Sequence, residues 1–160
     1  MTIHMENNVS RINTILEVVY KEAEIFLIEN ENIDIIDAKK WKNNPLKERI
    51  SLIDFNGEIN IKILFCIEEE LFQVMFQKCF PTMNEDERED LEDAFPDEII
   101  NLIVGLSIRH LPKELSNITL GVPYKMSSEN LDSFFSNNHC ETITLSTQYG
   151  NISINIADNF

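Results

Sequence analysis

Two polar side chains, Glu98 and Asn101, lie three residues apart in a segment whose apolar spacing predicts a helix. Residues three apart on a helix share a face, so this carboxylate and this carboxamide would point at one partner surface together. A carboxamide accepts and donates hydrogen bonds without ionising, which suits it to orient a water molecule. A bare Glu-x-x-Asn pair is more often only the solvated side of an amphipathic helix, so the surroundings must decide.

Other candidates for chemistry lack the spacing that catalysis or metal binding requires. The three histidines and three cysteines show neither the i, i+4 nor the C-x-x-C pattern of a metal site. No serine has a G-x-S-x-G context, and the four glycines form neither a P-loop nor a dinucleotide turn. The acidic run 85–93 lacks the alternating ligands of a calcium loop. We therefore expect no metal site and no cofactor held by this chain.

The segments around the pair resemble a known signature. They read Asp93-Ala-Phe-Pro-Asp-Glu98-Ile-Ile-Asn101-Leu-Ile-Val-Gly105 and Ile118-Thr-Leu-Gly-Val-Pro123. They are similar to the signature of the CheX, CheC and FliY chemotaxis phosphatases, in which an acidic or Ser residue precedes a Glu, an Asn and a more distant Pro. The resemblance extends along nearly the whole chain, through the hairpin near residue 56 and the closing strands.

The match to this signature has one departure. Glu98 and Asn101 fit it, and Pro123 falls one position early. The first position is Ala94, so the acidic residue or Ser is absent unless Asp93 substitutes through a small shift of the helix start. This departure bears on whether the chain is catalytic.

The resemblance implies a phosphatase that removes phosphate from the aspartyl-phosphate of a CheY-like response-regulator receiver domain. It implies that Asn101 orients the attacking water and that Glu98 anchors the receiver's Lys. The divalent cation is expected on the receiver, and the chain is expected to form a homodimer. The alternative is a non-catalytic CheX-like module that binds a receiver or serves dimerisation only, with the terminal hairpin 141–157 offering an edge for pairing between subunits.

The periodicity of apolar residues predicts helices and strands in an order typical of an α+β fold, with helices packed on a largely antiparallel sheet. The resemblance implies that this arrangement is CheC/CheX-like. Asn56-Gly57 predicts one tight hairpin turn and Tyr149-Gly150 a second. Gly105, in mid-helix, is expected to admit a neighbouring element of the chain. The predicted helices are 9–28, 68–79, 96–110 and a turn at 128–135; the predicted strands are 32–37, 48–55, 58–65, 118–125, 141–147 and 151–157, with a polar loop around Trp41 and Pro45.

Composition narrows the class of protein. With 160 residues, 43% of them hydrophobic, the chain suits a single domain spanning 1–160. The resemblance implies that this is a CheX-like phosphatase domain. A formal net charge of −15 argues against nucleic acid as a partner, because phosphate contacts need a basic surface. No apolar run approaches a membrane span, and the first residues lack a secretory signal. We expect no membrane association and a cytoplasmic location.

Overall fold

The chain begins with a long helix and then alternates strands and helices. The computed structural model describes residues 2–41 and 46–158, with side chains from 7 to 40 and from 46 to 158. In chain order the elements are α1 (Thr2–Ile25), η1 (Phe26–Asn30), β1 (Ile35–Trp41), β2 (Ile50–Gly57), β3 (Ile61–Ile67), α2 (Glu69–Cys79), α3 (Glu85–Ser107), η2 (Ile108–His110), η3 (Lys113–Leu115), β4 (Ile118–Leu120), β5 (Tyr124–Lys125), α4 (Ser128–Asn137), β6 (Cys140–Thr147) and β7 (Gly150–Asp158).

Seven strands of the described residues form one sheet, and every pair of neighbouring strands is antiparallel. The strand order is β1-β6-β7-β3-β2-β4, and β5 also pairs with β2. The last strands of the chain therefore lie in the middle of the sheet, between β1 and β3. The predicted α+β class, with helices packed on a largely antiparallel sheet, is confirmed.

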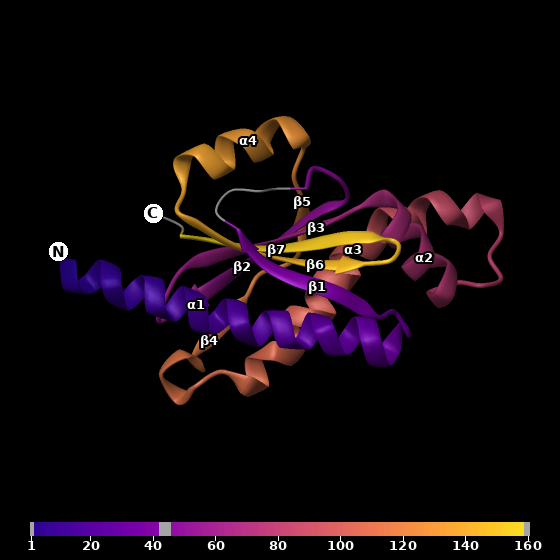
Figure 1. Ribbon diagram of the computed structural model, residues 1–160. Coiled ribbons are helices and arrows are strands. Elements are labelled where there is room, and N and C mark those ends of the chain that lie inside the picture. The colour runs from indigo at the N-terminus through magenta and orange to yellow at the C-terminus, as the bar shows by residue number, and fades with distance from the viewer. Residues whose placement is uncertain (1, 42–45, 159–160) are drawn as a thin grey trace.

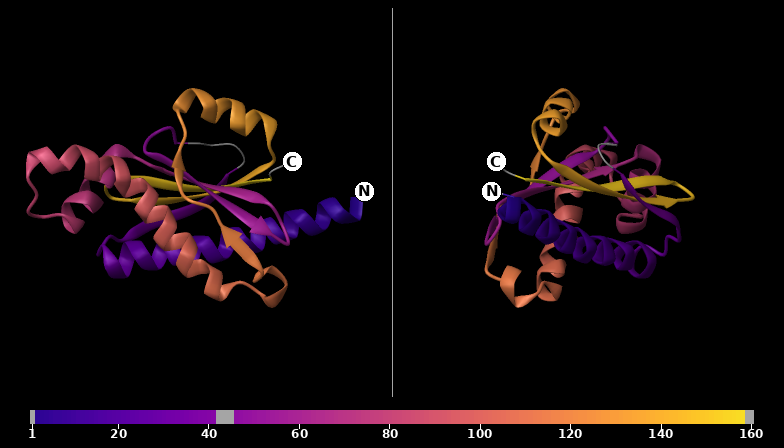
Figure 2. Two further views of the ribbon diagram at one scale, coloured as in Figure 1. Left: turned by 180° about the vertical axis from the view of Figure 1, so that it is seen from behind. Right: turned by 60° about the vertical axis from the view of Figure 1, so that its left-hand side comes forward.

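The two faces of the sheet carry separate apolar layers because side chains alternate along each strand. On β2, Ile53 and Phe55 belong to the larger core, which α1, α2 and α3 cover. Ile50 and Leu52 belong to a smaller core on the opposite face, which α4 covers. Figure 1 shows α4 on one side of the sheet and α1 on the other, and both views of Figure 2 show the same division.

Helix α3 begins at Glu85, well before the predicted start near Pro96. Its acidic first turn is favoured by the positive end of the helix dipole, and an ion pair of 2.7 Å between Arg88 and Glu92 spans one turn. Pro96 lies inside the helix, where it removes one backbone hydrogen-bond donor and its ring is buried. The acidic run 85–93 is thus helical, and Glu98 lies well inside the long helix α3.

The first hairpin is present, but its turn lies farther along the chain than predicted. β2 continues through Asn56 and Gly57, which pair with Thr119 and Ile118 of β4, so the turn falls at 58–60. A Cβ on Gly57 would lie 2.3 Å from a backbone carbonyl oxygen just before β4, so this close approach requires glycine. Pairing with a distant strand has overridden the local turn signal.

The predicted strand 118–125 is two short strands, β4 and β5, which both pair with β2. The interruption at 121–123 contains Pro123, which has no backbone donor for a ladder. The second hairpin is confirmed: Thr147 and Gly150 are partners, and Gly150 has a φ of 131°. The loop between β4 and β5 becomes important for the site.

The terminal hairpin has no free edge, so its expected role in pairing between subunits is wrong. β6 lies between β1 and β7, and β7 lies between β6 and β3. The first predicted strand also shifts, because β1 runs as far as Trp41, and Pro45 lies outside the described residues. Within the described part of the chain, no helix is long and apolar enough to cross a membrane.

Candidate functional site

Helix α3 presents Glu98 and Asn101 on its outward face. The residues between and after them, Ile99, Ile100 and Ile103, are at most 2% exposed and hold the opposite face of the helix in the core. Both polar side chains are exposed. Neither has a hydrogen-bond or ion-pair partner among the described residues. The sequence prediction that they share a helix face is confirmed by the position of both on one pocket.

The pocket has a second wall, far along the chain from the first. Its lining residues on α3 include Glu98 and Asn101, and those on the loop after β4 are Gly121, Val122 and Pro123. The volume of the pocket is ≈ 410 Å³. The fold thus brings the Pro of the signature to the same place as the Glu and the Asn.

Strand β2 holds the loop wall in place. The backbone N–H of Gly121 donates to the carbonyl oxygen of Asp54 at 2.8 Å. On the far side of the loop, Lys62 donates to the hydroxyl of Tyr124 at 2.8 Å and pairs with the Asp54 carboxylate at 2.5 Å. The loop is therefore fixed at both ends and does not depend on Val122 for its position.

The same strand also holds the helix wall. The hydroxyl of Ser51, which is fully buried on β2, donates a hydrogen bond to the carboxylate of Asp97 on α3. Asp97 lines the pocket next to Glu98 and precedes Asn101 by one turn. Both walls are thus attached to one strand, within four residues of each other along β2.

The charge of the pocket limits what it can do alone. Its lining contains the carboxylates of Asp97 and Glu98 and no Lys, Arg or His. A phosphate group would meet negative charge there without a cation to offset it. No group of His, Cys, Asp or Glu among the described residues has the arrangement of a metal site. The arrangement can orient a neutral molecule such as water and can bind a partner's cationic side chain.

Residues 49–146 of the chain match a protein-family model that is described as chemotaxis phosphatase CheX. The match covers more than half of the chain. The chain belongs to the CheX family.

Solved structures of CheX-like proteins share its fold. A CheC-like superfamily protein from Shewanella sp. PV-4 superposes with a TM-score of 0.70 at 17% identity, covering 90% of this chain and 96% of that one. CheX from Vibrio vulnificus gives 0.67 at 15% identity, covering 89% and 97%. A CheX–CheY–BeF3–Mg²⁺ complex from Borrelia burgdorferi gives 0.67 at 16%, covering 91% and 96%. No curated protein sequence matches the chain. The predicted CheC/CheX-like fold is confirmed.

The departure from the CheX signature is also visible in the pocket. Ala94 lines it, on the same face as Glu98 and Asn101. Asp93 does not substitute through a shifted helix start, because α3 runs continuously through both residues and the Asp93 carboxylate lies 3.9 Å from the Lys125 ammonium. The acidic side chain that does line the pocket beside Glu98 is Asp97.

Asp97, Gly121 and Val122 were not predicted from the sequence to be part of this site. The only signal for the loop was the approximate position of Pro123 in the CheX signature. Asp97 gave no signal, because its partner Ser51 is brought to it by the sheet alone. Gly105 was expected to admit an internal neighbour, and this is wrong: a Cβ built there meets nothing within 4 Å.

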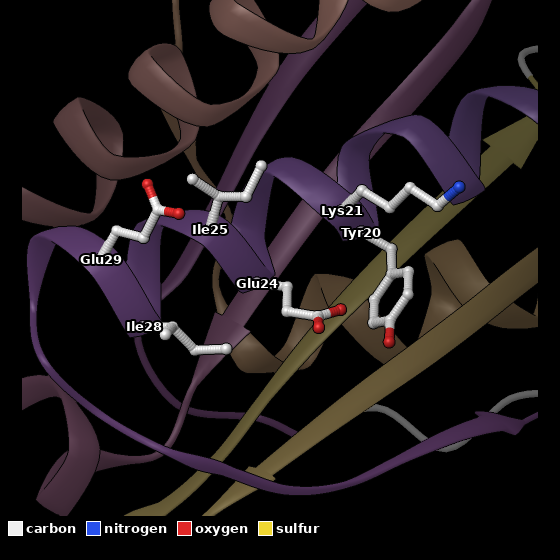
Figure 3. Close-up of a pocket in the computed structure, with 6 residues that line it drawn as sticks. All are labelled: Tyr20, Lys21, Glu24, Ile25, Ile28 and Glu29. Atoms are coloured by element: carbon white, nitrogen blue, oxygen red, sulfur yellow. The ribbon is translucent and has the colours of Figure 1, made fainter.

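A second hollow lies on α1 and its continuation η1, away from the CheX signature. It is lined by Tyr20, Lys21, Glu24, Ile25, Ile28 and Glu29. Figure 3 shows Tyr20, Glu24 and Ile28 on one side of the helix and Ile25 and Glu29 on the other. Burial and a hydrogen bond to Glu24 raise the pKa of the Tyr20 hydroxyl, so it stays neutral. The hollow offers exposed apolar surface with charges of both signs and no catalytic pair.

Proposed function

We propose that the chain dephosphorylates the aspartyl-phosphate of a CheY-like receiver domain. The observation that carries this proposal is that Glu98 and Asn101 are exposed together over one pocket and have no partner of their own among the described residues. Membership of the CheX family supports it. The complex of a Borrelia burgdorferi CheX with CheY, BeF3 and Mg²⁺ shows that a protein of this fold binds a receiver.

The receiver supplies the aspartyl phosphate, the divalent cation and a Lys near the phosphoryl group, so the external catalyst need only position water. The carboxamide of Asn101 enters the receiver's pocket and holds a water in line with the phosphorus–oxygen bond. The water oxygen bonds to phosphorus as the bond to the aspartate breaks. The products are inorganic phosphate and the free carboxylate of the receiver.

Glu98 binds rather than reacts in this scheme. Its carboxylate, one turn before Asn101, pairs with the receiver's Lys and fixes the orientation of the helix. The acidic lining also predicts that a free phosphate ester is a poor substrate, because only a partner that brings its own cations offsets the repulsion. We expect this reaction in the cytoplasm, where receiver domains signal.

The competing function is a CheX-like module that binds a receiver without hydrolysing its phosphate. Ala94 favours it, because the usual acidic residue or Ser is missing from the pocket. The two functions separate in one experiment, which measures both turnover of a phosphorylated receiver and affinity for the BeF3–Mg²⁺ form. Asn101→Ala should abolish turnover with little loss of affinity, and Glu98→Ala should mainly weaken affinity. If the chain only binds the receiver, the unsubstituted chain itself shows no turnover.

We further propose that the chain forms a homodimer through the hollow on α1. The outer edge of β1 is poorly suited to pairing, because the Asp37 carboxylate accepts the Ala38 N–H at 2.8 Å and the strand carries a register shift. On the hollow, Ile25 and Ile28 are 43% and 41% exposed. Lys21, between acidic neighbours, gives the face charges that a two-fold contact can match.

Sedimentation equilibrium tests this dimer. Ile28→Asp should shift the chain toward the monomer, because it places a charge in the apolar centre of the contact. Val9→Asp is the matched control, since Val9 is exposed on the same helix but does not line the hollow. A monomer before any substitution, or equal effects of both changes, contradicts the proposed contact.

A further inference from the structure

We infer that Val122, Leu102 and Gly105 form the surface on which the receiver docks around the catalytic pair; this inference rests on the proposed function. These three residues, here called the docking surface, lie on the two walls of the pocket or beside them. Val122 is on the loop wall, and Leu102 and Gly105 follow Glu98 and Asn101 on α3. The occupant is a protein surface that is apolar around a phosphorylated carboxylate and carries a basic residue to meet Glu98.

Val122 is an exposed apolar side chain on a rigid support. It is 84% exposed, the largest exposure among the large apolar side chains of the described residues. The loop that carries it is fixed by the Gly121–Asp54 hydrogen bond of 2.8 Å and by the pairing of β4 and β5 with β2. Because the loop is already ordered, little conformational entropy is lost when a partner covers Val122. An apolar side chain that is already held in place gives a partner surface to bury.

Leu102 provides apolar surface next to Glu98 on the helix wall. It is 44% exposed, whereas its neighbours Ile103 and Val104 are buried in the core. Leu102 and Val122 thus add apolar area to a site whose polar groups must work in the absence of bulk water. Apolar contacts around a polar centre exclude water from it. When the receiver covers the docking surface, bulk water would therefore be excluded from the site, and the water molecule held by Asn101 would remain.

Gly105 has no side chain, so the backbone of α3 is uncovered one turn beyond Asn101. Glycine lowers helix stability relative to alanine, so its presence in mid-helix needs a reason. A Cβ there would meet nothing within 4 Å, so no other part of the described chain requires a glycine. The open side of Gly105 continues the helix face that carries Asn101. A partner that inserts around Asn101 must approach this turn closely, and a side chain at 105 would obstruct it.

The charges near the docking surface favour a basic occupant over a second copy of this chain. Asp97 and Glu98 line the pocket, and Asp93 lies one turn earlier on the same helix. A copy of this chain carries a formal net charge of −15 and would add repulsion at this place. A receiver Lys offers the opposite charge at the point where Glu98 projects.

The test measures the affinity of three variants for CheY-type receiver domains of the source organism, loaded with Mg²⁺ and BeF3. Gly105→Gln should weaken binding at least tenfold while the thermal midpoint of the chain stays equal or rises. Val122→Ser should also weaken binding about tenfold. Ile36→Ser is the matched control, since Ile36 is 69% exposed on β1, at the opposite end of the strand order, and its change should leave affinity unaltered.

Two results overturn the docking surface. Unchanged affinity of both Gly105→Gln and Val122→Ser, with turnover still lost in Asn101→Ala, refutes it and leaves the proposed function intact. A change in self-association instead of receiver affinity assigns the surface to a second copy and refutes it as well. If the unsubstituted chain neither binds nor dephosphorylates any of these CheY-type receiver domains, the proposed function fails and the docking surface fails with it.

Discussion

The buried Ser51 on β2 donates a partly buried hydrogen bond to Asp97 on α3, one residue before Glu98 and one turn before Asn101. The rotation of the helix about its axis is therefore fixed at the level of the pair. A second hydrogen bond to β2, donated by the Gly121 N–H to the Asp54 carbonyl oxygen, fixes the opposite wall. A single strand thus sets the separation between the polar pair and the Pro123 loop.

Ser51→Ala removes the bond to Asp97 without changing any group that touches the receiver. We expect turnover to fall by about an order of magnitude, because small displacements of a positioning group are costly. The free energy of unfolding should fall by about 1–2 kcal/mol, because a partly buried carboxylate loses its donor. Turnover of a phosphoreceiver and urea denaturation measure both effects.

Ser107→Ala is the control for this change. Ser107 is also buried and lies on α3, the helix that carries Asp97, but its hydroxyl donates only to carbonyl oxygens of its own helix at 2.8 and 2.9 Å. Alanine is a good helix former, so this change should be nearly neutral. A loss of turnover in Ser107→Ala as large as in Ser51→Ala would contradict the positioning role of Asp97.

Gly121→Ala should displace the loop wall. A Cβ at this position would lie 3.3 Å from the Cβ of Asp54, so either the loop or the strand must move. We expect the free energy of unfolding to fall by about 1 kcal/mol and turnover to fall with it. Gly105→Ala is the contrasting change, since its Cβ is unobstructed and should stabilise the helix by about 1 kcal/mol. Chemical denaturation of both variants checks the opposite signs.

Sequence could predict the pair but not the strand that positions it. The shared face of Glu98 and Asn101 follows from helical periodicity, which is a local property. The contacts from Ser51 to Asp97 and from Asp54 to Gly121 join segments that meet only when the sheet assembles. The turn at Asn56-Gly57 was misplaced for the same reason, because pairing with β4 overrode a strong local signal.

Stability in acid should depend on Glu69. Two bonds from Arg49, of 2.7 and 2.8 Å, hold the pKa of the Glu69 carboxyl at about 2. Because this folded-state pKa lies below the ordinary value, the ion pair stabilises the chain above about pH 4.5, and this contribution disappears as the pH falls toward about 2. Since half of the Glu69 side chain is exposed, we expect only about 1 kcal/mol.

Urea denaturation between pH 6 and pH 2, a range set by the linkage above, compares Glu69→Gln with the unsubstituted chain. The difference in the free energy of unfolding between the two chains should be largest at the highest pH of this range and vanish at the lowest. Glu70→Gln, on the neighbouring exposed position, should show no such convergence. A difference between Glu69→Gln and the unsubstituted chain that is constant over the range would refute the ion pair as its cause.

Glu31 should have the opposite pH dependence. Burial raises the pKa of its carboxyl, and its Oε2 atom has no hydrogen-bond partner among the described residues. Because the folded-state pKa lies above the ordinary value, the charged form destabilises the chain at neutral pH, and this penalty is relieved as the pH falls through the folded pKa. Glu31→Gln should therefore stabilise the chain by about 1 kcal/mol near pH 8 and by less in acid.

Thermal denaturation as a function of pH checks the sign of the Glu31 effect. Glu58→Gln serves as the control, because Glu58 is exposed in the turn after β2 and does not line the hollow on α1. The thiol of Cys79 donates a hydrogen bond to Glu31 Oε1 at 3.2 Å. Because both the charged and the neutral carboxyl can accept this hydrogen bond, it does not account for the expected pH dependence. Destabilisation by Glu31→Gln at neutral pH would show that the buried charge has a stabilising partner.

The most direct test of the central claim is the lifetime of a phosphorylated receiver in the presence of this chain. With the chain at substoichiometric concentration, we predict loss of the aspartyl phosphate well above the spontaneous rate, with more than one receiver processed per chain. Asn101→Ala should return the decay to the spontaneous rate. Decay at the spontaneous rate with the unsubstituted chain, for every receiver that binds it, would contradict the claim that Asn101 positions the attacking water.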